Sequence, residues 1–179
     1  LSKLIWEAGT KPRNCPKGTN KPPLFIDDIA IERFCLTQQP FGSLPILYFT
    51  GSGVGEDDIT CESSGVTINT DAIDIKGVHN GIIRDNRIYN FNGFNSDAID
   101  LGEGSEDILI ENNIIYNIDD KGISIGHGST AEIRRNLIAN CGQGIGIKDE
   151  NSFGYIEHCS FYANRYGIAC FEKKFTIFR

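Results

Sequence analysis

The sequence predicts an all-β protein, a right-handed parallel β-helix (a solenoid) of about six coils. Two repeated strand patterns predict this fold class. A hydrophobic, polar, hydrophobic pattern recurs five times from residue 70 onward, and a second pattern follows each of its first four copies. The intervening segments lack helical periodicity, so a globular fold of mixed helices and strands is not expected.

The first pattern returns at a nearly constant interval. Its copies start at residues 72, 98, 122, 144 and 167, which lie 26, 24, 22 and 23 residues apart. Strands of successive coils pair about 4.8 Å apart, so equivalent positions form columns along the axis. The copies are Ala72-Ile73-Asp74-Ile75, Ala98-Ile99-Asp100-Leu101, Gly122-Ile123-Ser124-Ile125, Gly144-Ile145-Gly146-Ile147 and Gly167-Ile168-Ala169-Cys170.

The second pattern supplies an inward column of isoleucines, followed three residues later by an asparagine. We expect the asparagines to form an interior ladder, because asparagine in a repeated corner adopts a left-handed conformation and bonds neighbouring backbone. The inward column contains Ile83, Ile110, Ile133 and Ile156, and the ladder contains Asn86, Asn113 and Asn136, with Cys159 next. Extended backward, the template predicts strands at 29–36 and 59–66, with Ile31 and Cys61 inward, and pairs Leu47 and Phe49 with Ile73 and Ile75.

The position after the inward isoleucine carries alternating charges. Opposite charges on adjacent strands stabilise by about 0.2 to 1 kcal/mol, so this face is predicted to be a structural salt-bridge ladder. The column reads Glu32, Glu62, Arg84, Glu111, Arg134 and Glu157, with alternation from Glu62 onward.

Length and composition indicate one domain with a hydrophobic core. The chain has 179 residues, of which 40% are hydrophobic. We divide it into an N-terminal segment with a basic, proline-rich loop (1–28), the β-helix (29–172) and a C-terminal tail (173–179). The chain starts at Leu1 without a signal-like block, and its end has no evident cap. We therefore expect a mature form or a fragment, with further domains or a capping segment elsewhere.

Charge narrows the choice of partners. The formal net charge of -7 argues against nucleic acid, and no apolar run is long enough to predict a membrane span. Six cysteines show no metal-ligand spacing such as C-x-x-C, so the redox compartment stays open. Neutral sugars, cations and anionic substrates held by lysines remain as partners.

The candidate site lies on the outward face of the first strand pattern. The column at the start of the strands reads Asp71, Asp97, Lys121, Gln143 and Tyr166, and the mid-strand column reads Asp74, Asp100, Ser124, Gly146 and Ala169. Four carboxylates on two adjacent coils repel one another unless something compensates. A divalent cation, shared protons or the Lys121 ammonium would each do so.

These coils resemble the pectate-lyase-like right-handed β-helix superfamily over about residues 57 to 172. "NTDAID" at 69 to 74 is similar to the polygalacturonase motif "NTDGID", and Asp71, Asp97 and Lys148 match the polygalacturonase set. Ser96, Lys121 and Gly146 depart from it, since an aspartate, a histidine and an arginine are expected there.

The repeated motifs resemble more closely those of β-helix domains found beside spore-coat-kinase-like domains in bacterial surface proteins. "TDAIDI", "SDAIDL" and "DKGISIGHGS" resemble their successive coils. This resemblance implies the fold and an extracellular or cell-envelope location, and it does not carry over an activity.

Three functions stay open. As a polyuronide lyase, the protein would bind calcium through Asp71, Asp74, Asp97 or Asp100, and Lys121 would be the base, with its pKa lowered by neighbouring cations. As an inverting glycoside hydrolase, it would use Asp97 as acid and Asp71 to activate water. As a non-catalytic adhesion or spacer solenoid, it would use Lys121 only to cap the column of aspartates.

The remaining candidates lie at the other end of the strands. Lys148, by its match to the polygalacturonase "RIK" motif, and His127 are the predicted substrate-binding residues. His127 also shares a turn column with Glu103 and Asp149, which would give a metal site there. The predicted partner is a polysaccharide or other glycan, and the predicted cofactor is calcium.

Overall fold

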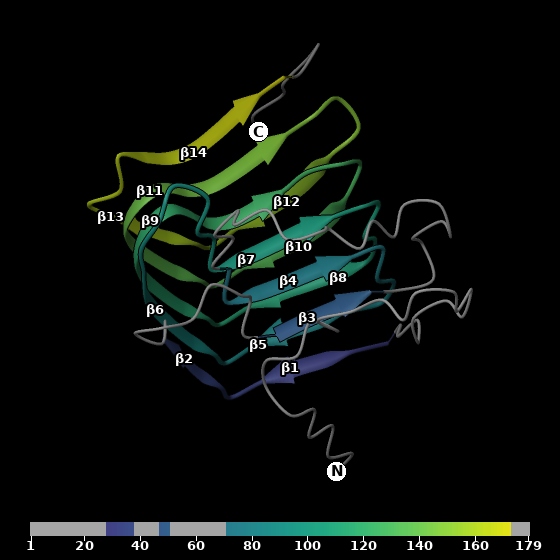
Figure 1. Ribbon diagram of the computed structural model, residues 1–179, viewed down its shortest axis with the longest axis horizontal. Coiled ribbons are helices and arrows are strands. Elements are labelled where there is room, and N and C mark those ends of the chain that lie inside the picture. Colours follow the sequence, from purple (N-terminus) through teal and green to yellow (C-terminus); the bar gives the residue numbers. More distant parts are fainter. Residues whose placement is uncertain (1–27, 38–46, 51–70, 173–179) are drawn as a thin grey trace, which may run out of the picture.

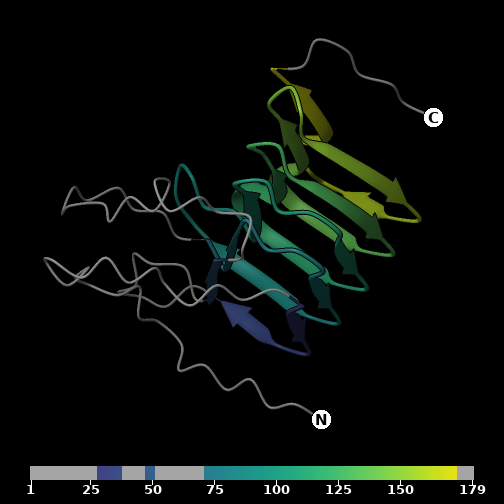
Figure 2. The ribbon, with the colours of Figure 1, turned by 90° about the vertical axis from the view of Figure 1, so that its right-hand side faces the viewer.

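Parallel strands wind around a common axis and stack coil on coil (Figures 1 and 2). The computed structural model describes residues 28–37, 47–50 and 71–172. The strands are β1 (Ala30–Glu32), β2 (Cys35–Thr37), β3 (Leu47–Thr50), β4 (Ile73–Lys76), β5 (Ile82–Arg84), β6 (Arg87–Phe91), β7 (Ile99–Gly102), β8 (Ile108–Glu111), β9 (Ile114–Ile125), β10 (Thr130–Arg134), β11 (Leu137–Lys148), β12 (Phe153–Glu157), β13 (Ser160–Tyr162) and β14 (Tyr166–Phe171).

Three flat faces enclose the core. One face is the five-stranded sheet β1-β5-β8-β10-β12. The other two belong to one larger sheet, because β9 and β11, each 12 residues long, run through the corner between them. We call the part that contains β3, β4, β7, β14 and the second halves of β9 and β11 the site face.

The predicted columns are confirmed by the strand register. On the site face Asp74 pairs with Asp100, Asp100 with Ser124, and Ser124 with Gly146. All strand pairs among the described residues are parallel, and Ile83 pairs with Ile110 as predicted. Alternation therefore sends the isoleucines of each strand inward and its polar residues outward.

The coil count is lower than predicted. The described residues make about four turns, whereas the sequence predicts about six. Ile31 pairs directly with Ile83, so no coil stands between β1 and β5. The predicted strand at 59–66, with Cys61, lies outside the described residues, as do residues 1–27 and the predicted tail at 173–179.

The core is a stack of aliphatic side chains. Ile73, Ile99 and Ile123 are fully buried, and they pair in successive coils of the site face. Burial of each such side chain stabilises the fold by about 1.5 to 3 kcal/mol. Cys159 and Cys170 are free thiols packed against this core, as their inward columns predict.

The asparagine ladder is confirmed, but its backbone conformation is not the predicted one. The Asn86 side-chain amide donates to Asn113 Oδ1 at 3.0 Å, and Asn113 donates to Asn136 Oδ1 at 3.0 Å. The left-handed residues lie one position earlier, at Asp85, Asn112, Arg135 and His158. These residues turn the chain, and the buried asparagines then bond the strands of neighbouring coils.

The charge ladder is also present, with one partner changed. Arg84 Nη2 lies 2.5 Å from Glu32 Oε1, and Arg134 Nε lies 2.9 Å from Glu111 Oε2. Arg84 pairs with Glu32 because β1 and β5 are adjacent, and the predicted partner Glu62 lies outside the described residues. This face is structural, as predicted.

Candidate functional site

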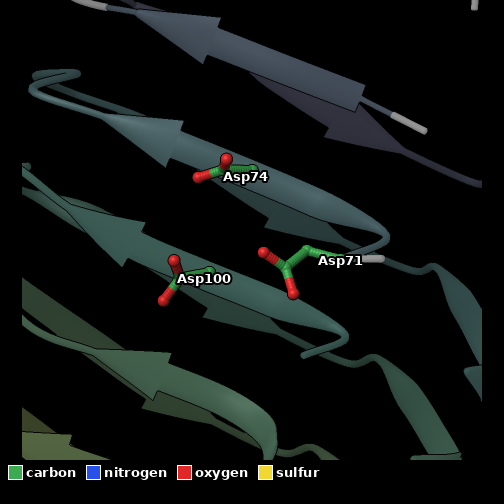
Figure 3. Close-up of side chains that lie close together, drawn as sticks. All are labelled: Asp71, Asp74 and Asp100. Carbon is green, nitrogen blue, oxygen red and sulfur yellow. The ribbon is translucent and has the colours of Figure 1, made fainter. Parts of the chain in front are cut away.

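Three carboxylates gather on the site face where β4 and β7 pair. One ligand oxygen from each of Asp71, Asp74 and Asp100 lies within 4.8 Å of the other two (Figure 3). Asp71 precedes β4, Asp74 lies within it, and Asp100 is the register partner of Asp74 on β7. Asp71 and Asp74 are each only 1% exposed, so these charges are removed from bulk water.

Asp97 belongs to a different set of contacts from the other predicted metal ligands. Asp71 Oδ1 accepts a hydrogen bond from the Asp97 backbone N–H at 2.7 Å, and Asp97 Oδ1 accepts one from the Lys121 backbone N–H at 2.9 Å. Each aspartate of this column therefore satisfies a backbone donor of the next coil. The predicted cluster of four carboxylates divides into a group of three and a separate Asp97–Lys121 pair.

Lys121 is a buried cation between two carboxylates. It is 8% exposed, and its Nζ lies 3.4 Å from Asp97 Oδ1 and 2.5 Å from Asp120 Oδ2. The absence of a side chain at Gly146 makes room for it, because a Cβ at Gly146 would meet Lys121 Cδ at 2.8 Å. The repeat columns do not predict the contact with Asp120, although this residue directly precedes the lysine in "DDK".

Burial and the repulsion between neighbouring carboxylates raise the pKa values of Asp71 and Asp97. Burial, together with the charges of Asp97 and Asp100, raises the pKa of Asp71 to about 8. Burial also raises the pKa of Asp97, although the Lys121 cation opposes this shift. Asp71 therefore holds a proton at neutral pH, which is one of the three compensations that the sequence allows.

The pKa of Lys121 moves in the opposite direction from the one expected of a lysine base. Burial lowers the pKa of its ammonium, but Asp97 and Asp120 together raise it above its ordinary value. Its neighbours in the structure are carboxylates and not cations. Lys121 is therefore a fixed positive charge in this arrangement.

The donor set fits a hard cation such as calcium. Carboxylate oxygens of Asp71, Asp74 and Asp100 are ligands that calcium prefers. Within the described part of the chain, Asp100 Oδ1 and Ser124 Oγ are buried without a hydrogen-bond partner, and both belong to the mid-strand column. Buried polar atoms of this kind are costly and rare, so an additional ligand for them is expected.

The predicted substrate-binding residues lie at the far end of the strands. The His127 backbone N–H donates to Asp149 Oδ2 at 2.5 Å, and its Nδ1 lies 3.1 Å from Glu103 Oε1. Lys148 lies over Gly126, where a Cβ would meet Lys148 Cε at 2.4 Å. The structure keeps His127 and Lys148 on the same edge of the site face, separate from the three carboxylates.

Lys76 is a further basic residue at this edge that the sequence analysis did not single out. Its Nζ lies 3.5 Å from Asp74 Oδ1. Lys76 pairs with Gly102 in the strand register, so its long side chain faces a position without one. It connects the carboxylate cluster to the basic edge.

Comparison with protein families assigns the fold. Residues 47–179 match the family described as "Right handed beta helix region". The chain belongs to this family, and its parallel solenoid fits the pectate-lyase-like right-handed β-helix superfamily that the repeats resemble. A search of curated proteins finds no match, and a search of solved structures finds none either. The described part of the chain has no helix with the length and apolar character needed to cross a membrane.

Proposed function

We propose that this β-helix binds an acidic polysaccharide outside the cell or in the cell envelope, through a calcium ion held on the site face. Asp71, Asp74 and Asp100 would hold the ion, and a bound calcium ion would bridge the protein carboxylates to a carboxylate of the glycan. The observation that carries the proposal is the convergence of these carboxylates beside Asp100 Oδ1 and Ser124 Oγ, two buried atoms without partners.

Lys121 supplies the second half of the recognition. Its ammonium lies in the column that continues past Asp71 and Asp97, two coils along the axis from Asp71. The ammonium is paired with Asp97 and Asp120, but it has three donors, and a sugar carboxylate at this position would accept a charge-assisted hydrogen bond from it. A neutral polysaccharide gains nothing from this charge, so the site favours polyuronides.

Calcium titration calorimetry at pH 8 tests the metal half of the proposal. We expect a saturable heat for the wild type and its loss in Asp100→Asn, which keeps the side-chain shape and removes one ligand charge. Asp85→Asn is a matched control, because Asp85 is an exposed aspartate in a left-handed turn that asparagine tolerates. Equal heats for wild type and Asp100→Asn would contradict the assignment.

Affinity electrophoresis in gels that contain polygalacturonate tests the glycan half. The wild type should be retarded in calcium and migrate freely with a chelator, and Lys121→Gln should be retarded less. A gel with neutral galactan provides the comparison for charge. Equal retardation by both polymers would contradict recognition of the carboxylate.

A polyuronide lyase is the second candidate, favoured by the burial of Lys121 at the edge of the acidic cluster. In this reaction the amine would take the proton beside the uronate carboxyl, and the bond to the leaving oxygen would break to give an unsaturated sugar. The raised pKa of Lys121 opposes the reaction, because a protonated amine is no base.

Lys121→Arg separates binding from elimination. Arginine keeps the positive charge but stays protonated in proteins, so it cannot act as the base. Binding alone predicts retained retardation in the gel and no ultraviolet absorbance from unsaturated product in either protein. Elimination predicts such absorbance in the wild type and its loss in Lys121→Arg.

The two other functions left open by the sequence have less support. An inverting hydrolase needs one ionised carboxylate as base, and the pKa values of both Asp71 and Asp97 are raised. A spacer without a ligand leaves the buried Ser124 Oγ and Asp100 Oδ1 unexplained. New reducing ends without ultraviolet absorbance would support the hydrolase, and absence of both calcium and glycan binding would support the spacer.

A further inference from the structure

A second polar hollow lies at the corner where β9 and β11 turn into the site face. Its volume is about 550 Å³, and its wall includes Asp119, Asn140, Gly142, Ala163 and Arg165. We call it the corner pocket. The proposed calcium site does not use any of these residues, and Asp119 and Asp120 directly precede Lys121 in the chain.

A glycine in the middle coil lines this pocket and lets the chain approach the coil below closely. The register between β9 and β11 shifts between Cys141 and Gln143, because Asp119 and Asp120 occupy the space opposite the single residue Gly142. A Cβ at Gly142 would meet the Asp119 carbonyl oxygen at 2.5 Å and that of Asp120 at 2.7 Å. A side chain is thus excluded at Gly142, where the middle coil packs directly on the backbone of the coil below.

Two residues of opposite charge line the corner pocket. Asp119 is exposed on the lower coil and Arg165 on the upper coil, and Gly142 lies between them. No ion pair joins Asp119 to Arg165 in the described residues, and Asp119 Oδ2 accepts a hydrogen bond from the Gly93 backbone N–H at 2.9 Å. Arg165 is held in place, because its backbone N–H donates to the Cys141 carbonyl and its guanidinium lies 5.4 Å from the centre of the Tyr166 ring.

An amide ladder ends at the same pocket. Asn117 Nδ2 donates to Asn90 Oδ1 at 2.8 Å, and Asn140 Nδ2 donates to Asn117 Oδ1 at 2.7 Å. The equivalent residue in the next coil is Ala163, whose methyl group cannot donate. The ladder therefore ends with the acceptor Asn140 Oδ1 on the pocket wall.

We propose that the corner pocket is a second subsite for an acidic sugar, and that it binds one uronate residue without a metal. Arg165 takes the carboxylate, since a guanidinium matches a carboxylate in bidentate geometry. Asn140 Oδ1 and Asp119 Oδ1, the carboxylate oxygen that does not bond Gly93, accept hydrogen bonds from sugar hydroxyls. A uronate carries both kinds of group on one ring, whereas a neutral sugar offers nothing to Arg165.

This inference deepens the proposed glycan function, because it uses the same substrate class at a separate place. Tyr166 follows Arg165 and continues the column of Asp71, Asp97, Lys121 and Gln143. A chain of uronates that enters at the corner pocket thus has a continuous polar path to Lys121. The pocket would add contacts to a longer oligosaccharide and set the direction in which it lies.

Nuclear magnetic resonance titration with glucuronate, in the presence of a chelator, tests the subsite. The backbone amide of Gly142, the Arg165 side-chain Nε–H and the Asn140 side-chain amide should shift saturably. Arg165→Gln should weaken the apparent affinity at least tenfold. Glucose should cause no shift at Arg165. Arg135→Gln is the control, because Arg135 is an exposed arginine away from the pocket.

The outcome is independent of the calcium site. Asp100→Asn should leave the glucuronate shifts unchanged, so a failed calcium experiment with intact shifts at Gly142 would remove the metal but keep the subsite. Unmoved signals at Gly142 and Arg165 would overturn the subsite, as would equal affinity in Arg165→Gln. Shifts confined to Lys121 would also overturn it and place uronate binding on the site face alone.

Discussion

The proton on Asp71 makes the stability of the fold depend on pH in a defined direction. The pKa of this carboxyl is about 8 in the folded protein, against an ordinary value of 3.8. Between these values the folded chain holds a proton that the unfolded chain has released. The free energy of unfolding therefore falls as pH rises, by up to about 1.4 kcal/mol per pH unit.

The whole effect amounts to at most about 6 kcal/mol, fully present below pH 3.8 and fully lost above pH 8. Asp97 also makes the free energy of unfolding fall as pH rises, because its pKa is raised as well. Asp71→Asn isolates the first residue. Its side-chain oxygen still accepts the Asp97 N–H, but it carries no charge at any pH.

Urea unfolding of wild type and Asp71→Asn at a series of pH values from 5 to 9, with a chelator present, measures the difference. We expect the wild type to lose stability relative to the variant as pH rises, and the difference to level off above pH 8. Asp85→Asn should follow the wild type. A difference that stays constant with pH, or a wild type that gains relative stability as pH rises, would refute the reasoning.

Three further predictions follow from the same contacts. Calcium should displace the Asp71 proton, so calorimetry at pH 7 in buffers of different ionisation enthalpy should show release of about one proton per ion, and a buffer-independent heat would contradict this. Asn113→Ala should destabilise the fold by about 1 to 3 kcal/mol in urea unfolding, because Asn86 and the Ile83 carbonyl lose buried partners. Asn95→Ala, at an exposed turn residue without a positive φ, should cost less. Gly146→Val should displace Lys121 and weaken retardation by polygalacturonate while calcium heat persists, and unchanged retardation would show that the Lys121 position does not matter.

The columns of the solenoid could be predicted because the side-chain period of a strand is fixed. Once Ile73 and Ile99 are aligned, Asp74 and Asp100 must face the same side and meet. The coil count could not be predicted in the same way. The segment at 59–66 alternates like a strand, whereas in the described residues Ile31 pairs directly with Ile83.

The sequence predicts which residues lie at the candidate site better than it predicts the contacts between them. Stacking places the four aspartates and Lys121 on adjacent coils, but hydrogen bonds decide that Asp97 faces Lys121 and leaves the other three as a group. The β-bulge that places Asp119 and Asp120 opposite the single residue Gly142 is a local irregularity of the repeat. A regular pattern cannot predict where it breaks.

The central claim is that Asp71, Asp74 and Asp100 hold a cation. A crystal structure of the protein with calcium, with anomalous diffraction data to identify the ion, tests it most directly. The account predicts a single strong anomalous peak between these three carboxylates, within about 2.3 to 2.6 Å of their oxygens. A peak at His127 and Glu103 instead, or a water-filled cluster in saturating calcium, would contradict it.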